Sequence, residues 1–159
     1  MKKVTYLTES AKKFTKEEAI AEAKRCLLCE EAYCNKRCPI NSNPKEFVKL
    51  VATEQFEKAI KLIRDNNPLF YSICTRVCPY DSYCVGGCRK SALGDNPIMI
   101  PFIQKYLVDY CDASDEVITS DHIQPKKVGQ KVAIIGSGPA GLAAAAVLGQ
   151  KGYEVTVFE

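Results

Sequence analysis

The sequence predicts a mostly α-helical domain followed by a small βαβ unit of the Rossmann type. Apolar residues recur every three or four positions between residues 15 and 110, and capping residues or prolines precede several of these stretches. From residue 131 the pattern changes to two short apolar runs separated by a glycine-rich turn and an alanine-rich segment. We therefore expect a helical domain over residues 1–112, a linker over 113–130 and the βαβ unit over 131–159.

The first domain is expected to consist of amphipathic helices joined by loops that carry cysteine. Thr15 and Glu18 have the spacing of a capping box and open the first helix. Pro44 and Pro101 each stand at a helix start, whereas Pro68 ends a helical stretch. The residues expected to face the core are Ala19, Ile20, Ala23, Phe47, Leu50, Val51, Phe56, Ala59, Ile60, Ile63, Ile103, Tyr106, Leu107 and Tyr110.

Composition and charge narrow the class of protein. Of the 159 residues, 47% are hydrophobic and 26% are charged, which is ordinary for a soluble globular protein. The first residues lack the apolar core of a signal peptide, and no later segment approaches the roughly 18 apolar residues of a membrane span. The net charge of +3 is too small to favour nucleic acid as a partner. A cytoplasmic protein without membrane contact is expected.

Nine cysteines dominate the chemistry of the chain. In a reducing compartment they indicate metal binding rather than disulfides. Eight of them form two runs, Cys26-x2-Cys29-x4-Cys34-x3-Cys38-Pro39 and Cys74-x3-Cys78-Pro79-x4-Cys84-x3-Cys88. Thiolates are the ligands of cuboidal iron–sulfur clusters, and in the bacterial ferredoxin pattern the cysteine before proline ligates the other cluster. The runs therefore predict two [4Fe–4S] clusters, with Cys38 outside the cluster that the rest of its run holds.

Other interpretations of the cysteines remain open. Eight thiolates could also fill two closed zinc sites of an interaction module, although runs of four close cysteines with a Cys-Pro step favour clusters. A redox-active dithiol is disfavoured, because no C-x-x-C opens a helix beside the βαβ unit, and a degenerate remnant would bind no metal. Cys111 is interpreted as a packing residue, and His122 has no neighbours that favour a ligand role. No nucleophile–base pair or carboxylate dyad is present, so no catalytic residue is predicted.

Residues 26–104 resemble the N-terminal iron–sulfur domain shared by dihydropyrimidine dehydrogenases, their bacterial NAD(P)H-oxidising subunits and the small subunit of glutamate synthase. The matching motifs are Arg25-Cys-Leu-Leu-Cys29, Cys34-x3-Cys38-Pro39, Asn67-Pro-Leu69, Arg76-Val-Cys-Pro79 and Cys84-Val-Gly-Gly-Cys88. The resemblance implies that cluster one is held by Cys26, Cys29, Cys34 and Cys88. It implies that cluster two is held by Cys38, Cys78, Cys84 and the amide oxygen of Gln104. Spacing alone would select Cys74 as the fourth ligand, and we prefer Gln104.

The glycine-rich turn has the spacing of a dinucleotide-binding motif. Gly136 permits the tight turn, Gly138 lets a pyrophosphate approach the backbone, and Gly141 lets helix and strand pack closely. Glu159, after the second strand, is placed to bind ribose hydroxyls. With Pro139 and Ala140 the turn resembles the FAD-binding form of the motif that follows the iron–sulfur domain in the same family. A glycine-rich turn without a ligand is the alternative.

We expect the βαβ unit to be truncated, because a doubly wound domain needs more strands. The resemblance implies that the rest of an FAD domain and an NAD(P)H domain follow, and that a flavin-containing catalytic subunit is the partner. The chain is then the electron-transfer part of an NAD(P)H-dependent oxidoreductase, without turnover of its own. Gln104 favours the branch that reduces uracil or thymine, and an electron donor of the glutamate synthase small-subunit type is the alternative.

Overall fold

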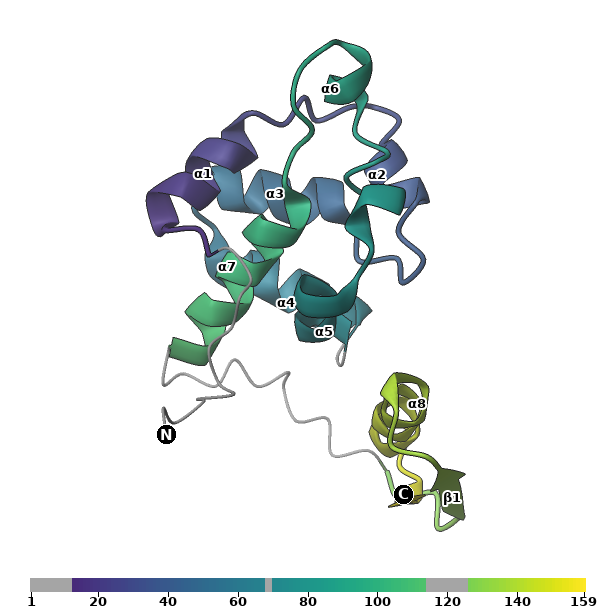
Figure 1. Cartoon of the computed structure of the whole chain (residues 1–159). Helices are drawn as coiled ribbons and strands as arrows, with labels where there is room; N and C mark the ends of the chain where they lie inside the picture. The colour runs from purple at the N-terminus through teal and green to yellow at the C-terminus, as the bar shows by residue number, and fades with distance from the viewer. Residues whose placement is uncertain (1–12, 68–69, 114–125) are drawn as a thin grey trace, which may run out of the picture.

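The computed structural model describes residues 13–67, 70–113 and 126–159 (Figure 1). The first two stretches form a helical domain, and the third forms a βαβ unit. Most of the expected linker, including His122, lies outside the described residues. The helical elements are α1 (Lys16–Lys24), α2 (Tyr33–Lys36), α3 (Pro44–Ala52), α4 (Phe56–Asn66), α5 (Phe70–Val77), the 3₁₀ helix η1 (Tyr80–Ser82), α6 (Arg89–Ala92) and α7 (Ile100–Ala113). The βαβ unit consists of β1 (Lys131–Ile135), α8 (Pro139–Gln150) and β2 (Glu154–Phe158).

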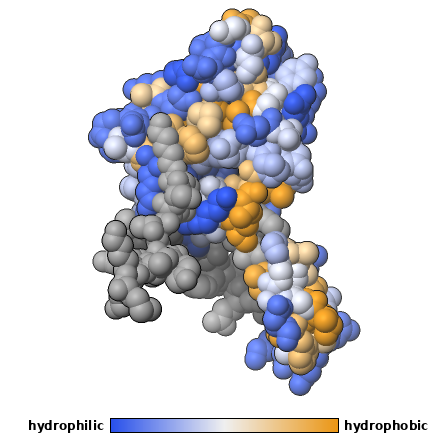
Figure 2. Space-filling view, viewed as in Figure 1, coloured by the Kyte–Doolittle hydropathy of each residue, from blue (hydrophilic) through white to orange (hydrophobic). Residues whose placement is uncertain are grey.

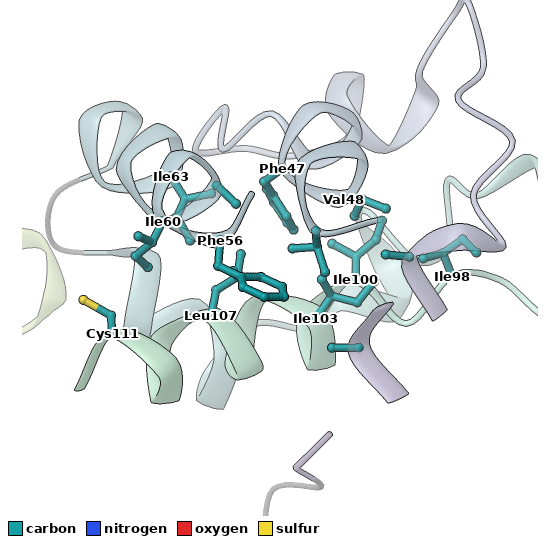
Figure 3. Packing of buried hydrophobic residues seen from close by; sticks show 14 residues of the cluster. Phe47, Val48, Phe56, Ile60, Ile63, Ile98, Ile100, Ile103, Leu107 and Cys111 are labelled. Atoms are coloured by element: carbon teal, nitrogen blue, oxygen red, sulfur yellow. The ribbon is translucent and has the colours of Figure 1, made fainter. Parts of the chain in front are cut away.

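The core of the helical domain lies between α1, α3, α4 and α7, as Figure 3 shows. Phe47, Ile60, Ile63, Ile103 and Leu107 have no exposed surface. Because these residues recur at helical spacing in the sequence, the predicted amphipathic helices are confirmed. α7 is the longest helix, and it packs against α1, α3, α4 and α5.

The predicted helix starts are confirmed, with one local difference. Thr15 and Glu18 form both hydrogen bonds of the capping box, with Thr15 N donating to Glu18 Oε2 at 2.8 Å and Glu18 N donating to Thr15 Oγ1 at 3.2 Å. α3 begins at Pro44, but the preceding Asn43 has left-handed backbone angles and does not cap the helix. Its side chain instead accepts a hydrogen bond from Asn35 Nδ2 at 2.7 Å.

Two cysteines of the runs lie on helices, where the sequence analysis expected loops. Cys34 lies in α2 and Cys74 in α5. Phe70, Ile73 and Val77 recur at helical spacing in the sequence of α5, a signal for this helix that the sequence analysis did not use. α5 packs against α7, and this contact stabilises the short helix.

The βαβ unit has the predicted topology. β1 and β2 are parallel, with Lys131 opposite Glu154 and Ile135 opposite Phe158, and α8 is the crossover. A Cβ atom on Gly141 would lie 2.0 Å from the Gly136 carbonyl oxygen, so the approach of α8 to the turn requires glycine there. None of the described residues of this unit is buried, and Figure 2 shows hydrophobic side chains on its surface. Among the described residues, none of the helices combines the length and apolar character needed to cross a bilayer.

Candidate metal centres

The first cavity in the helical domain brings together cysteines from both runs. It lies beside the first turn of α3 and the loop between η1 and α6. Three of its cysteines come from the first run and one, Cys88, is the last cysteine of the second run. The cysteines that line it are Cys26, Cys29, Cys34 and Cys88. The fold therefore gathers the set of side chains that the sequence predicts for cluster one.

The second cavity is larger, about 240 Å³, and is lined by the remaining cysteines of the two runs. Its lining contains Cys38, Cys74, Cys78, Cys84 and Gln104. The predicted ligand set of cluster two is thus present around one space. Cys74 also lines this cavity. A cysteine that is not a ligand would be expected to face away from the site, and the structure does not show this for Cys74.

The electrostatic interactions of the thiols divide the cysteines into the same two groups. The pKa of the Cys34 thiol is raised to about 11, mainly by burial and in smaller part by Cys26 and Cys88. Burial likewise raises the pKa of Cys84 to about 12, with Cys78 and Cys38 as its nearest like charges. Cys34 also contributes weakly to the pKa of Cys84. The two cavities are therefore neighbours in the helical domain.

The raised pKa values of the cysteine thiols mean that cluster binding must remove their protons. Burial also raises the pKa of Cys74 to about 12, and that of Cys26 and Cys78 above the ordinary value. At neutral pH these thiols keep their protons, mainly because burial disfavours the charged thiolate and also because neighbouring thiolates would repel one another. A cationic iron–sulfur core would remove that repulsion, so metal binding and proton release are coupled at both cavities.

Gln104 is held with its amide oxygen available. The side chain is 5% exposed, and its Nε2 donates to the carbonyl oxygen of Tyr71 at 2.6 Å. Among the described residues, Gln104 Oε1 forms no hydrogen bond. An amide whose nitrogen is anchored presents its oxygen in a defined direction, which is the arrangement that an oxygen ligand requires. The identity of the fourth ligand nevertheless stays a prediction.

Close backbone contacts join the two cysteine runs. A Cβ atom on Gly87 would lie 3.1 Å from the Tyr33 carbonyl oxygen, so the approach of the second run to the first favours glycine there. Arg37, which lies between Cys34 and Cys38 in the sequence, donates from its guanidinium to the Gly86 carbonyl oxygen at 3.1 Å. Sequence analysis missed this function of Arg37. Its position inside a cysteine run was the only available signal.

Two cysteine sulfur atoms also accept hydrogen bonds from the chain. Ser42 N lies 3.4 Å from Cys38 Sγ, and Ser42 Oγ lies 3.2 Å from the same sulfur. Ile98 N donates to Cys88 Sγ at 3.4 Å. Hydrogen bonds to ligand sulfur stabilise the thiolate form and raise the potential of an iron–sulfur cluster. Neither Ser42 nor Ile98 was identified from the sequence.

The donor types that line each cavity fit an iron–sulfur cluster. Four cysteines line the first cavity, and four cysteines and the Gln104 amide line the second. Thiolates are the ligands of such clusters. In the part of the chain that the structure describes, no three Cys, His, Asp or Glu side chains form a site for a single metal ion.

The dinucleotide motif has the local geometry that its chemistry needs. Gly136 and Gly138 lie between β1 and α8, and Pro139, Ala140 and Gly141 form the first turn of α8. Glu159 follows β2, and its Oε2 accepts a hydrogen bond from Ser137 N at 2.5 Å. Hydrogen bonding by the Ser137 side chain, and then by its backbone, lowers the pKa of the Glu159 carboxyl, which therefore stays ionised beside the turn. The binding of ribose hydroxyls by Glu159 stays a prediction.

Comparison with known proteins identifies both units. Residues 3–116 match the family described as "Dihydropyrimidine dehydrogenase domain II, 4Fe-4S cluster", and residues 134–159 match the family described as "NAD(P)-binding Rossmann-like domain". The chain is 40% identical over its whole length to the NAD-dependent dihydropyrimidine dehydrogenase subunits PreT of Salmonella typhimurium and Escherichia coli K12. It is 35% identical, over 92% of its length, to the glutamate synthase [NADPH] small chain of Azospirillum brasilense.

These relatives are longer proteins. The chain covers 37% of each PreT subunit and 30% of the glutamate synthase small chain. The similarity therefore concerns the iron–sulfur domain and the beginning of a dinucleotide-binding domain, both of which the sequence predicted.

The crossed ligand assignment predicts the effect of replacing Cys88. In Cys88→Ala, cluster one should be lost and cluster two should remain, so iron and sulfide should fall to about half of the unmodified content. Because the free energy of metal binding is also folding free energy, the helical domain should unfold at a lower temperature. Iron analysis, electron paramagnetic resonance (EPR) of the reduced protein and thermal unfolding measure these effects.

Cys111→Ala is the matched control, since Cys111 is a buried cysteine outside both cavities. It should retain both clusters. A Cys88→Ala protein with the full iron content would show that the crossed assignment is wrong.

A second prediction concerns the fourth ligand of cluster two. Gln104→Ala should open one iron of that cluster to water or added thiol, whereas Cys74→Ser should leave both clusters in place with a modest loss of stability. Gln104→Cys should give cluster two a full thiolate set and lower its potential through the added negative charge. EPR of the reduced proteins, with and without added thiol, distinguishes these states. Loss of cluster two in Cys74→Ser together with a silent Gln104→Ala would exclude the glutamine ligand.

Proposed function

The chain belongs to the family of iron–sulfur proteins described by domain II of dihydropyrimidine dehydrogenase, and we propose that it conducts electrons through two [4Fe–4S] clusters. The single observation that carries this proposal is the pair of neighbouring cavities, each lined by one complete predicted ligand set. The family match to residues 3–116 supports it. All nine cysteines lie in the described part of the chain and are free thiols, as ligands must be and as a reducing cytoplasm would keep them.

The helical core has a defined part in this function. α3 contributes its first turn to both cavities through Pro44, and Ile100 at the start of α7 also borders both. Elements of a rigid core that border two sites hold those sites at a constant separation. A constant, short separation is what a protein must supply for electron transfer, since the redox chemistry is that of the clusters.

The source of electrons is a nicotinamide cofactor by way of FAD. The glycine turn, the first turn of α8 and Glu159 would hold the pyrophosphate and a ribose of the flavin nucleotide. When bound, FAD accepts a hydride from the nicotinamide and passes electrons on singly. The match of residues 134–159 to a dinucleotide-binding family supports this step, and the names of the relatives include NAD or NADPH.

The destination of electrons is a flavin-containing catalytic subunit that reduces uracil or thymine. Two observations support this choice over other acceptors. The chain matches dihydropyrimidine dehydrogenase subunits at 40% identity over its own whole length. Gln104 also occupies the position that the resemblance assigns to that branch of the family. Donation to a glutamate synthase large subunit is the second candidate, because the Azospirillum brasilense small chain is 35% identical.

The proposal predicts the metal content of the chain. Protein purified without oxygen should contain about eight irons and about eight sulfides and should absorb broadly in the blue, because two cubes require that number. Iron and sulfide assays with a visible spectrum test this directly. Stoichiometric zinc in colourless protein would contradict the proposal and favour the zinc-stabilised interaction module, and protein that binds no metal would favour a degenerate remnant.

The acceptor requires a separate experiment. A longer protein that carries this chain together with its FAD and NAD(P)H domains should support NAD(P)H-dependent reduction of uracil when mixed with a pyrimidine-reducing flavin subunit. The assay measures NAD(P)H oxidation that depends on uracil. Electron transfer only to a glutamate synthase large subunit would refute the pyrimidine acceptor without affecting the two clusters.

A further inference from the structure

The two cavities differ in the charge of their walls. Three cationic residues and no carboxylate line the first cavity: Lys45, Arg89 and Lys90. Among the described residues that line the second cavity, none is charged.

Lys45 is the most informative of the three cations. It lies in the first turn of α3, is half-buried, and forms no ion pair with a carboxylate among the described residues. Lys90 is paired with Asp95 at 2.6 Å, which compensates part of its charge, and Arg89 is exposed to solvent. Lys45 is thus the cation of this wall whose charge no carboxylate compensates among the described residues.

The backbone adds to the positive potential at this wall. Pro44, Lys45 and Val48 of α3 line the first cavity, so the N-terminal end of this nine-residue helix faces it. The helix dipole gives that end a partial positive charge, although the Lys45 N–H group is already bonded to Asn35 Oδ1 at 2.9 Å. The side chain of Lys45 and the helix that carries it therefore act in the same direction.

The predicted clusters differ in charge in the corresponding way. Cluster one has four thiolate ligands, whereas cluster two has three thiolates and a neutral amide oxygen, so cluster one bears one more negative charge. That charge alone would make cluster one harder to reduce. The first cavity supplies cations and the second does not, which matches each wall to the cluster it is predicted to hold.

We propose that Lys45, assisted by Arg89 and Lys90, offsets the extra thiolate charge of cluster one and raises its reduction potential. The proposal rests on the two-cluster function above and assigns Lys45 a positioning and tuning role, without contact to the irons. A positive charge near a cluster stabilises the electron that reduction adds. The consequence is that the potentials of the two clusters lie closer together than their ligand sets alone would place them.

Lys45→Gln tests the proposal, with Lys49→Gln as the control. Lys49 lies one turn further along the same helix, is largely exposed and pairs with Glu46 at 3.5 Å. The measurement is a redox titration of the reconstituted chain followed by EPR, which reports the midpoint potential of each cluster. In Lys45→Gln the reduction equilibrium of cluster one should become about tenfold less favourable, which is about 59 mV for one electron. Cluster two should not change, Lys45→Arg should restore the unmodified value, and Lys49→Gln should move neither potential.

A second variant covers the case in which Lys45→Gln fails to assemble. Arg89→Gln changes an exposed side chain, so it should fold normally and lower the potential of cluster one alone. An unchanged potential for cluster one in assembled Lys45→Gln, or an equal shift of both clusters, would overturn the proposal. If Lys45→Gln does not assemble, an unchanged potential in Arg89→Gln would overturn it. An unmodified chain that binds no iron or sulfide would instead refute the two-cluster function itself.

Discussion

The structure depends on one constraint, which is that cysteines from two distant runs surround the same cavity. Cys88 lines the cavity of Cys26, Cys29 and Cys34, while Cys38 lines the cavity of the later run. Each run thus gives one cysteine to the cavity that the other run mainly lines. The segment between the runs, α3 and α4, must therefore fold back, and its apolar faces form the core that makes this return possible.

Because each run places one cysteine in the cavity of the other, contacts between the runs that do not involve cysteine are also needed. Arg37 donates a hydrogen bond to the Gly86 carbonyl oxygen, and the absence of a side chain at Gly87 lets the second run approach the Tyr33 carbonyl oxygen. These contacts join the two runs next to Cys88. The thiols themselves oppose such gathering, because burial and mutual repulsion raise their pKa values. The helical core therefore prepares two sites that become fully stable only when a cationic core neutralises the thiolates.

Much of this could be predicted from the sequence, because its signals are local. Helical spacing of apolar residues predicted α1, α3, α4 and α7, and the capping box predicted the first residue of α1. The change of period at residue 131 and the glycine spacing predicted β1, α8 and β2. The spacing of the two cysteine runs predicted two clusters, and the resemblance to a known family predicted which cysteines would meet.

The sequence by itself determined which residue types are present and at what spacing, and that was enough for the chemistry of the sites. Only the tertiary structure decided what surrounds each site. α5 packs against α7, Gln104 is anchored to the Tyr71 carbonyl oxygen, and the charge of each cavity wall depends on elements far apart in the sequence. Lys45 and Arg89 are ordinary cations in the sequence. They face the same cavity because packing against the core brings the first turn of α3 and the start of α6 together, and no local pattern records that contact.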